Sequence, residues 1–105
     1  MSKGVFKMIK VVAKFIVQQN KIEEFKDRVE ELIEKTRQEE GNIFYELYQD
    51  VENAQVLTFI EEWESPEALK AHMKTEHFQG TVPELEKLLI KEMEEVEINI
   101  YKLVK

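Results

Sequence analysis

Apolar and polar residues alternate along four segments of the chain, and a period of two residues is the spacing of a β-strand. The first segment covers residues 8–17 and has one wholly apolar face: Ile9, Val11, Ala13, Phe15 and Val17. The same alternation predicts strands over 43–49, 55–63 and 96–104. Residues 50–53 (Asp-Val-Glu-Asn) form a turn sequence, so the second and third strands are predicted to make a hairpin.

Helical spacing appears between the first and second strands. One apolar stripe recurs every three or four residues there: Ile22, Phe25, Val29, Leu32, Ile33 and Thr36. Asn20 and Glu23 are predicted to form a capping box at the start of this helix. Gly41 is predicted to end it in a left-handed conformation.

A second helix is predicted directly after the third strand. Ser65 suits the N-cap, and Pro66 suits the first helical position, where its missing N–H costs nothing. We expect this helix to end near Lys74. A further short helix is predicted over 82–89, before the last strand.

The resulting order, β-α-β-β-α-β, predicts an α+β fold of the ferredoxin-like type. Residues 8–105 are expected to form one domain, and residues 1–7 are expected to be a leader or the product of an alternative start. Right-handed crossovers would put every helix on one face of the sheet. Large apolar side chains nevertheless occur on both strand faces, as with Phe15 beside Ile16 and Phe59 beside Ile60. We therefore expect a homodimer packed sheet against sheet, a dimeric α+β barrel. The alternative is a monomer whose second sheet face stays half-wet.

Composition narrows the possible partners. A net charge of −7 argues against nucleic acid and against an anionic membrane surface, because both bind basic patches. The absence of cysteine excludes disulfides and thiol catalysis. No apolar run approaches the length of a membrane span, so a cytoplasmic protein is expected.

Candidate chemistry gathers where the third strand meets the following helix. Glu61 and Trp63 share a strand face with Phe59. A carboxylate among aromatic rings would have a raised pKa and suit proton transfer. Alternatively, Glu61 reaches water and pairs with a lysine. His72, on the helix, is either a functional imidazole or a hydrogen-bonded packing residue.

A metal site at His72, Glu76 and His77 is conceivable, but a spacing of five residues places the two imidazoles poorly on one helix face. We therefore predict no metal. Ser65 is better explained as a cap than as a nucleophile, and three scattered glycines make no phosphate-binding loop.

Residues 61–72, Glu-Glu-Trp-Glu-Ser-Pro-Glu-Ala-Leu-Lys-Ala-His, followed by His77-Phe78, resemble the signature of the antibiotic biosynthesis monooxygenase family. Residues 41–50, Gly-Asn-Ile-Phe-Tyr-Glu-Leu-Tyr-Gln-Asp, extend the resemblance. It implies a dimeric α+β barrel with a pocket between sheet and helices. It also implies oxygenation of quinol or phenolic rings by O2, with no cofactor.

The resemblance assigns pocket and proton-transfer roles to Trp63 and His72. With Glu61 they are the predicted catalytic residues, and the predicted substrate-binding residues are Phe15, Tyr45, Phe59, His77 and Phe78. Phe59 stands where aromatic polyketide oxygenases carry an asparagine, and Phe15 is the residue nearest to the asparagine of haem-degrading relatives. Both activities are therefore disfavoured.

Two other functions remain open from the sequence. One is isomerisation of a small phosphorylated carbonyl compound, with His72 as acid and base. The other is a non-catalytic dimer that binds small hydrophobic ligands. Oxygen uptake with a quinol distinguishes the monooxygenase from both.

Overall fold

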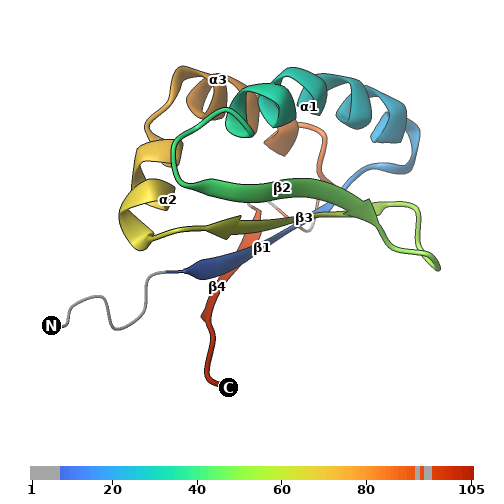
Figure 1. Ribbon diagram of the computed structural model, residues 1–105. Coiled ribbons are helices and arrows are strands. Elements are labelled where there is room, and N and C mark those ends of the chain that lie inside the picture. Colours follow the sequence, from blue (N-terminus) through green and yellow to red (C-terminus); the bar gives the residue numbers. More distant parts are fainter. Residues whose placement is uncertain (1–7, 92, 94–95) are drawn as a thin grey trace, which may run out of the picture.

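A computed structural model describes residues 8–91, 93 and 96–105 (Figure 1). The predicted leader, residues 1–7, lies outside the described residues. The elements are β1 (Ile9–Ile16), the 3₁₀ helix η1 (Gln19–Lys21), α1 (Ile22–Thr36), β2 (Asn42–Gln49), β3 (Val56–Trp63), α2 (Pro66–Met73), α3 (Glu76–Glu86) and β4 (Glu97–Lys102). None of the helices in the described ranges is long and apolar enough to cross a membrane.

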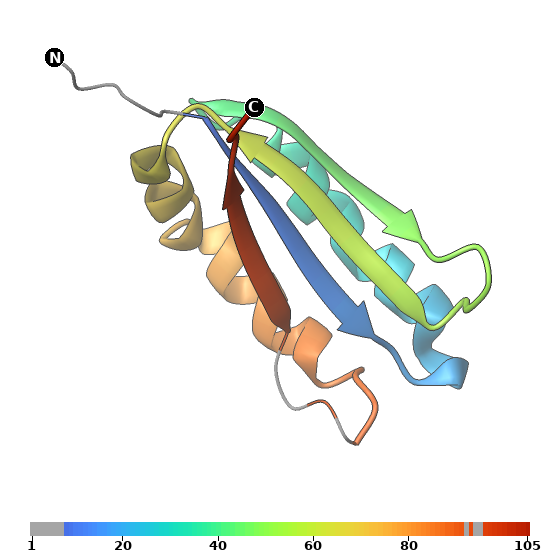
Figure 2. The ribbon, with the colours of Figure 1, turned by 90° about the horizontal axis from the view of Figure 1, so that it is seen from below.

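The four strands form one antiparallel sheet in the order β2-β3-β1-β4. The three α-helices cover one face of this sheet, and the other face has no covering element in the described part of the chain (Figures 1 and 2). This arrangement confirms the predicted ferredoxin-like α+β fold. The predicted strands are all present, and their ends differ from the predicted ones by no more than two residues.

Strand register decides which side chains face the helices. Val11 pairs with Glu61 across β1 and β3, and Glu61 pairs in turn with Tyr45 on β2. Ala13 pairs with Phe59 on the same face. All of these residues are buried, so Glu61 lies in the middle of the sheet's inner face.

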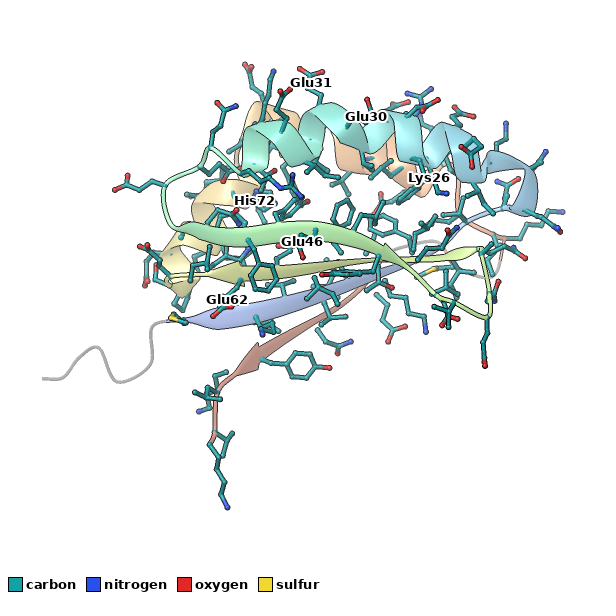
Figure 3. The ribbon with its side chains drawn as sticks, turned by 45° about the vertical axis from the view of Figure 1, so that its right-hand side comes forward. Lys26, Glu30, Glu31, Glu46, Glu62 and His72 are labelled. Atoms are coloured by element: carbon teal, nitrogen blue, oxygen red, sulfur yellow. The ribbon has the colours of Figure 1, made fainter. Side chains whose placement is uncertain are left out.

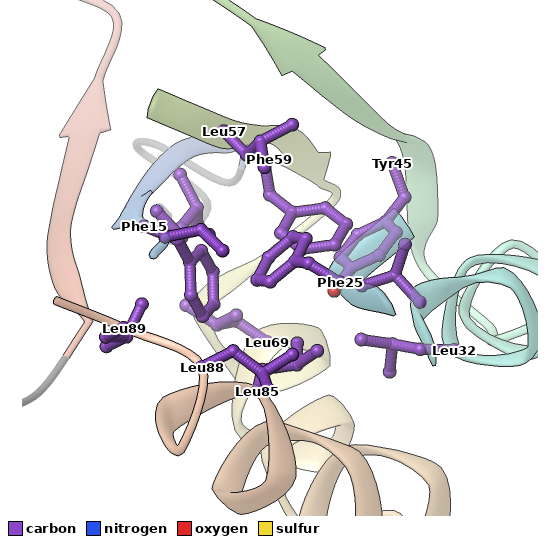
Figure 4. Close-up of a cluster of buried hydrophobic side chains, with 14 of the residues drawn as sticks. Phe15, Phe25, Leu32, Tyr45, Leu57, Phe59, Leu69, Leu85, Leu88 and Leu89 are labelled. Carbon is purple, nitrogen blue, oxygen red and sulfur yellow. The ribbon is translucent and has the colours of Figure 1, made fainter. Parts of the chain in front are cut away.

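Aromatic rings form the centre of the core between sheet and helices (Figure 4). Phe15 meets Phe25 of α1 edge-on with ring centroids 5.0 Å apart, and it meets Phe59 at 5.9 Å. Leu32, Leu85 and Leu88 are also buried in this cluster. Burying one such side chain contributes about 1.5–3 kcal/mol relative to leaving it exposed.

Local signals predicted α2 well. The Ser65 hydroxyl accepts a hydrogen bond from the Ala68 amide at 3.1 Å, and Pro66 is the first helical residue, which confirms the predicted start. The predicted capping box of α1 is wrong. Asn20 lies inside η1, and the N-cap residue Lys21 makes no side-chain cap.

The predicted ends of two other helices are also corrected. Gly41 does have a left-handed backbone, with φ of +88°, but it precedes β2, and α1 ends earlier at Thr36. The helix expected over 82–89 is α3, which begins at Glu76 because the Thr75 hydroxyl accepts a hydrogen bond from the Phe78 amide at 3.2 Å. Pro83 lies inside this helix instead of near its start.

Candidate functional site

A cavity of about 270 Å³ lies between the inner face of the sheet and helices α2 and α3. Most of its lining is apolar or aromatic, including Phe15, Tyr45, Phe59 and Phe78. The ionisable lining residues, apart from Tyr45, are Glu61, His72 and Glu86. A cavity of this composition suits a small ring-shaped or otherwise apolar molecule.

The cavity opens beside β4. Ile98 and Ile100 pair with Ala13 and Val11 of β1, so they belong to the inner face of the sheet. They nevertheless remain 51% and 56% exposed while lining the cavity, as does Met73 of α2 at 40%. An apolar rim of this kind gives a hydrophobic ligand a favourable entrance.

Glu61 is the carboxyl group in the cavity wall. It is only 5% exposed, and its Oε1 accepts a hydrogen bond from Trp63 Nε1 at 2.9 Å. Burial raises the pKa of Glu61 to about 7, and the negative charge of Glu39 acts in the same direction. The hydrogen bond from Trp63 opposes this change. Glu61 can therefore take up or release a proton near neutral pH.

His72 is the second proton-exchanging group, and it is 1% exposed. Figure 3 shows it between the helices and the sheet. Its ring lies 4.7 Å from Trp63, 5.0 Å from Phe78 and 5.5 Å from Tyr45, measured between ring centroids. Burial lowers the pKa of His72, although Glu39 favours the charged form. A neutral imidazole that lines the cavity can act as a base.

Tyr45 keeps its proton under all ordinary conditions. Burial raises its hydroxyl pKa far above the usual value, and the charges of Glu61 and Glu39 raise it further. Its ring packs against that of Phe59, and the two ring centroids are 4.9 Å apart. Tyr45 therefore offers the cavity wall an aromatic surface and a neutral hydroxyl.

Glu39, which follows α1, joins the two histidines. Its Oε2 lies 2.8 Å from His72 Nδ1 and 2.5 Å from His77 Nε2. The side chains of Glu39 and His77 are both largely buried. Sequence reasoning missed Glu39, because one acidic residue among 22 carries no distinguishing local signal.

Among the described residues, these three side chains also form the one group with metal-ligand chemistry, and their ligand atoms lie within 4.8 Å of one another. Glu39 takes the position that the sequence-based set gave to Glu76, which is exposed. Ligands of a tetrahedral zinc ion would lie about 3.4 Å apart. The observed separations from the shared Glu39 oxygen, 2.8 and 2.5 Å, are both shorter than that; the first is an ordinary hydrogen-bond length, and the second is shorter still.

The predicted site residues divide into two groups. Phe15, Tyr45, Phe59, Glu61, His72 and Phe78 line the cavity. Trp63 and His77 are not among the lining residues. Trp63 touches two residues that line it, Glu61 and His72, and His77 reaches His72 through Glu39. Apart from Phe78, the sequence did not point to the lining residues of α3, such as Leu85, or to those of β4, such as Ile98.

The fold and the site together define a small α+β domain that encloses an apolar cavity with two proton-exchanging groups. The model of the antibiotic biosynthesis monooxygenase family matches residues 8–84, and the chain belongs to this family. The resemblance seen in residues 61–78 is thereby confirmed.

Individual relatives agree with this assignment. "Putative monooxygenase YcnE" of Bacillus subtilis is 37% identical over 82 residues, which cover 78% of this chain and 86% of that protein. The crystal structure of a conserved protein from Methanosarcina mazei Go1 is 43% identical, with a TM-score of 0.85 over 90% of this chain and 91% of that one. A crystal structure described as an antibiotic biosynthesis monooxygenase is 31% identical, with a TM-score of 0.84 over 92% of this chain and 99% of its own.

Proposed function

We propose that this protein is a cofactor-independent monooxygenase that acts on quinols or related phenols. The observation that carries the proposal is the pairing of a mainly apolar cavity with the buried groups His72 and Glu61. The family names of its relatives support oxygenation as the reaction class. The quinol substrate is carried over from the family resemblance of residues 61–78, and the mainly apolar and aromatic cavity lining is compatible with it.

In this mechanism His72 takes the proton of one substrate hydroxyl. The resulting phenolate is electron-rich and transfers an electron to O2, which then bonds to the ring carbon. One oxygen atom stays on the ring and the other leaves as water, so that a quinol and O2 give a hydroxyquinone and water. The two electrons that reduce the second oxygen atom to water come from oxidation of the quinol to the quinone level, so no external reductant is needed. An apolar cavity favours these reaction steps because it excludes water from the reactive phenolate.

The other residues shape this chemistry. Glu61, with a pKa of about 7, can return a proton to the developing peroxide or product. Trp63 holds the Glu61 carboxyl group through its indole N–H. Tyr45, Phe59 and Phe78 form aromatic walls against which a ring can stack.

Oxygen consumption tests the proposal directly. A panel of hydroquinones is incubated with the protein in air and under argon, and products are identified by mass spectrometry. We expect an oxygenated product in air alone, at a rate that falls sharply in a His72→Ala variant. Absence of oxygen uptake across the panel would contradict the monooxygenase function.

The same panel separates the alternatives. An isomerase would convert a phosphorylated carbonyl compound equally in air and argon. The cavity lining contains Glu61 and Glu86 but neither lysine nor arginine among the described residues, which disfavours a phosphate group. Ligand binding without turnover would indicate a binding protein.

We also propose that two copies of the chain associate through the uncovered sheet face. Val12 and Ile60 pair at its centre and remain only partly buried in the single chain. Phe44 lies on the same face, and the Lys10 Nζ is 5.5 Å from the centroid of its ring. Tyr48 and Tyr101 add exposed aromatic surface on the neighbouring strands. An apolar surface shared by identical chains favours a two-fold dimer.

A further inference from the structure

Glu39 is not among the residues that line the cavity. Its carboxylate nevertheless contacts His72, the base in our proposed mechanism. Glu39 Oε2 lies 2.8 Å from His72 Nδ1 and 2.5 Å from His77 Nε2, so both histidines contact the same oxygen. His72 belongs to α2, His77 to α3, and Glu39 to the segment between α1 and β2. Three elements therefore meet at one carboxylate.

We propose that Glu39 is a positioning residue that fixes His72 in the Nδ1–H tautomer and so makes Nε2 the basic atom available to a ligand in the cavity. The catalytic consequence of this inference rests on the proposed function. The tautomer itself does not, and it can be measured in the free protein.

The tautomer follows from the chemistry of the two partners. An ionised carboxylate only accepts hydrogen bonds, so the imidazole nitrogen that faces it must carry the proton. A neutral imidazole has one N–H and one lone pair, which places the lone pair of His72 on Nε2. Since Nδ1 is occupied by Glu39, Nε2 is the ring nitrogen of His72 that remains for a substrate hydroxyl in the cavity that this residue lines.

Glu39 also stabilises the product of proton transfer. When Nε2 accepts a proton, His72 becomes an imidazolium whose Nδ1–H already points at a negative charge. Such a charge-assisted hydrogen bond is stronger than a neutral one, especially away from water. Glu39 thus favours the state that forms when the substrate loses its proton, without touching the substrate.

His77 has a complementary part in this arrangement. Its Nε2–H donates to the same oxygen and keeps the carboxylate from rotating away from His72. Only 16% of its side chain is exposed, so the contact is well shielded from water. His77 therefore acts on the carboxylate and not on the ligand, in contrast to the substrate-binding role that the sequence suggested.

Nitrogen NMR of the imidazoles tests the assignment. The chain has only two histidines, so selective ¹⁵N labelling gives four ring nitrogens to assign. Protonated, unprotonated and metal-bound ring nitrogens resonate in separate ranges. We expect a protonated Nδ1 and an unprotonated Nε2 for His72, and a protonated Nε2 for His77. A protonated Nε2 on neutral His72, or metal-bound shifts on both rings of the purified protein, would overturn the proposal.

Variants then test the role of Glu39. Glu39→Ala removes the acceptor and should abolish the preference of His72 for Nδ1–H. Glu39→Gln keeps a carbonyl acceptor, so it should preserve the tautomer while losing the charge. Glu40→Gln is the matched control, because it makes the same charge change at an exposed neighbouring position and should leave the spectrum unchanged. An unchanged His72 tautomer in folded Glu39→Ala would contradict the assignment.

Kinetics provide the second readout. With a quinol substrate, Glu39→Ala should lower kcat on the order of 10²-fold, within the usual contribution of a general base, and change KM little. Glu40→Gln should retain wild-type kcat. Full kcat in folded Glu39→Ala would overturn the positioning role. If the wild-type protein oxidises no quinol, the proposed function fails, whereas the NMR result still decides the tautomer.

Discussion

At Glu61, burial and a hydrogen bond from Trp63 act on the carboxyl group in opposite directions, and burial prevails. Glu61 is paired with Val11 and Tyr45 on the two neighbouring strands and is only 5% exposed, so water solvates its negative charge poorly. The same property that suits Glu61 to proton exchange therefore makes the folded protein sensitive to pH.

The free energy of unfolding should fall as pH rises from about 4.5 to about 7. The pKa of Glu61 is about 7 in the folded chain, against an ordinary value of 4.5, so folding favours the protonated form. Its stabilising contribution is complete below about pH 4.5 and is lost as pH rises through about 7. The difference is about 3 kcal/mol. We expect urea denaturation between pH 4 and 8 to show this loss in the wild type relative to Glu61→Gln.

Glu62→Gln is the control for that measurement, because the neighbouring side chain points to the opposite face of the sheet. It should follow the pH dependence of the wild type. A Glu61→Gln variant with the same pH dependence as the wild type would show that Glu61 ionises normally.

We expect His72 to contribute both to the stability of the fold and to the proposed activity. His72 is 1% exposed, and its ring contacts those of Trp63 and Phe78. It also supplies one of the two hydrogen bonds to Glu39.

His72→Ala should therefore lose quinol turnover by roughly 10²–10⁴-fold and also lose about 1–3 kcal/mol of stability. Stopped-flow or oxygen-electrode kinetics measure the first effect, and denaturant unfolding measures the second. Lys70→Ala, at an exposed position on the same helix, should alter neither. Wild-type turnover by folded His72→Ala would remove His72 from the mechanism.

At the scale of elements, Gly41 joins the start of β2 to the end of β3 and to α2. Its carbonyl accepts a hydrogen bond from the Glu64 amide at 2.8 Å. Its φ of +88° lies in the left-handed region that favours glycine. A Cβ at this position would lie 2.6 Å from the Cβ of Ala68. That atom is bonded directly to the backbone of α2, so it cannot move aside unless the helix moves. The helix that carries His72 is therefore held close to the sheet by a residue without a side chain.

Gly41→Ala should destabilise the protein by about 1–3 kcal/mol, because it combines an unfavourable backbone conformation with a steric overlap. Gly80→Ala is the natural control. Gly80 lies inside α3 with nothing within 4 Å of an added Cβ, so alanine should be neutral or stabilise by up to about 1 kcal/mol. Urea denaturation of both variants measures the difference. Equal stabilities would contradict the role assigned to Gly41.

At the scale of the whole molecule, the uncovered sheet face is the outstanding feature (Figure 2). Apolar side chains such as Val12 and Ile60 alternate there with charged ones such as Lys10 and Lys14. Half-buried aliphatic residues in the centre of a sheet gain from the exclusion of water, and in the proposed dimer a second copy would supply the covering surface.

Sedimentation equilibrium at micromolar concentration should give a species of twice 12.5 kDa. Ile60→Glu should convert it to a monomer that keeps its far-UV spectrum, because the new charge would be buried in the interface while the helix-covered core stays intact. Glu62→Gln serves again as a control on the same face and should remain dimeric. A stable 12.5 kDa species for the wild type would contradict the dimer.

The sequence by itself determined the order of elements, since strand and helix periodicities are local and each segment shows its own. It placed Phe59, Glu61 and Trp63 on one face for the same reason, and Ser65 and Pro66 defined the start of α2 through contacts within one turn. The fold class followed from that order. Helix ends were predicted less accurately: α3 starts at the local cap Thr75, ahead of the predicted residue 82, and α1 ends at Thr36, ahead of Gly41.

Only the tertiary structure decided how the site is completed. Glu39 and His72 are 33 positions apart, and Glu39 and His77 are 38 apart, so no local pattern connects them. The crossovers of the fold bring the end of α1 beside α2 and α3, and this places one of many similar carboxylates against both imidazoles. Burial, which depends on all surrounding elements at once, then sets the pKa of Glu61 and of His72. Sequence spacing can identify a proton-exchanging side chain, but its environment arises from long-range contacts.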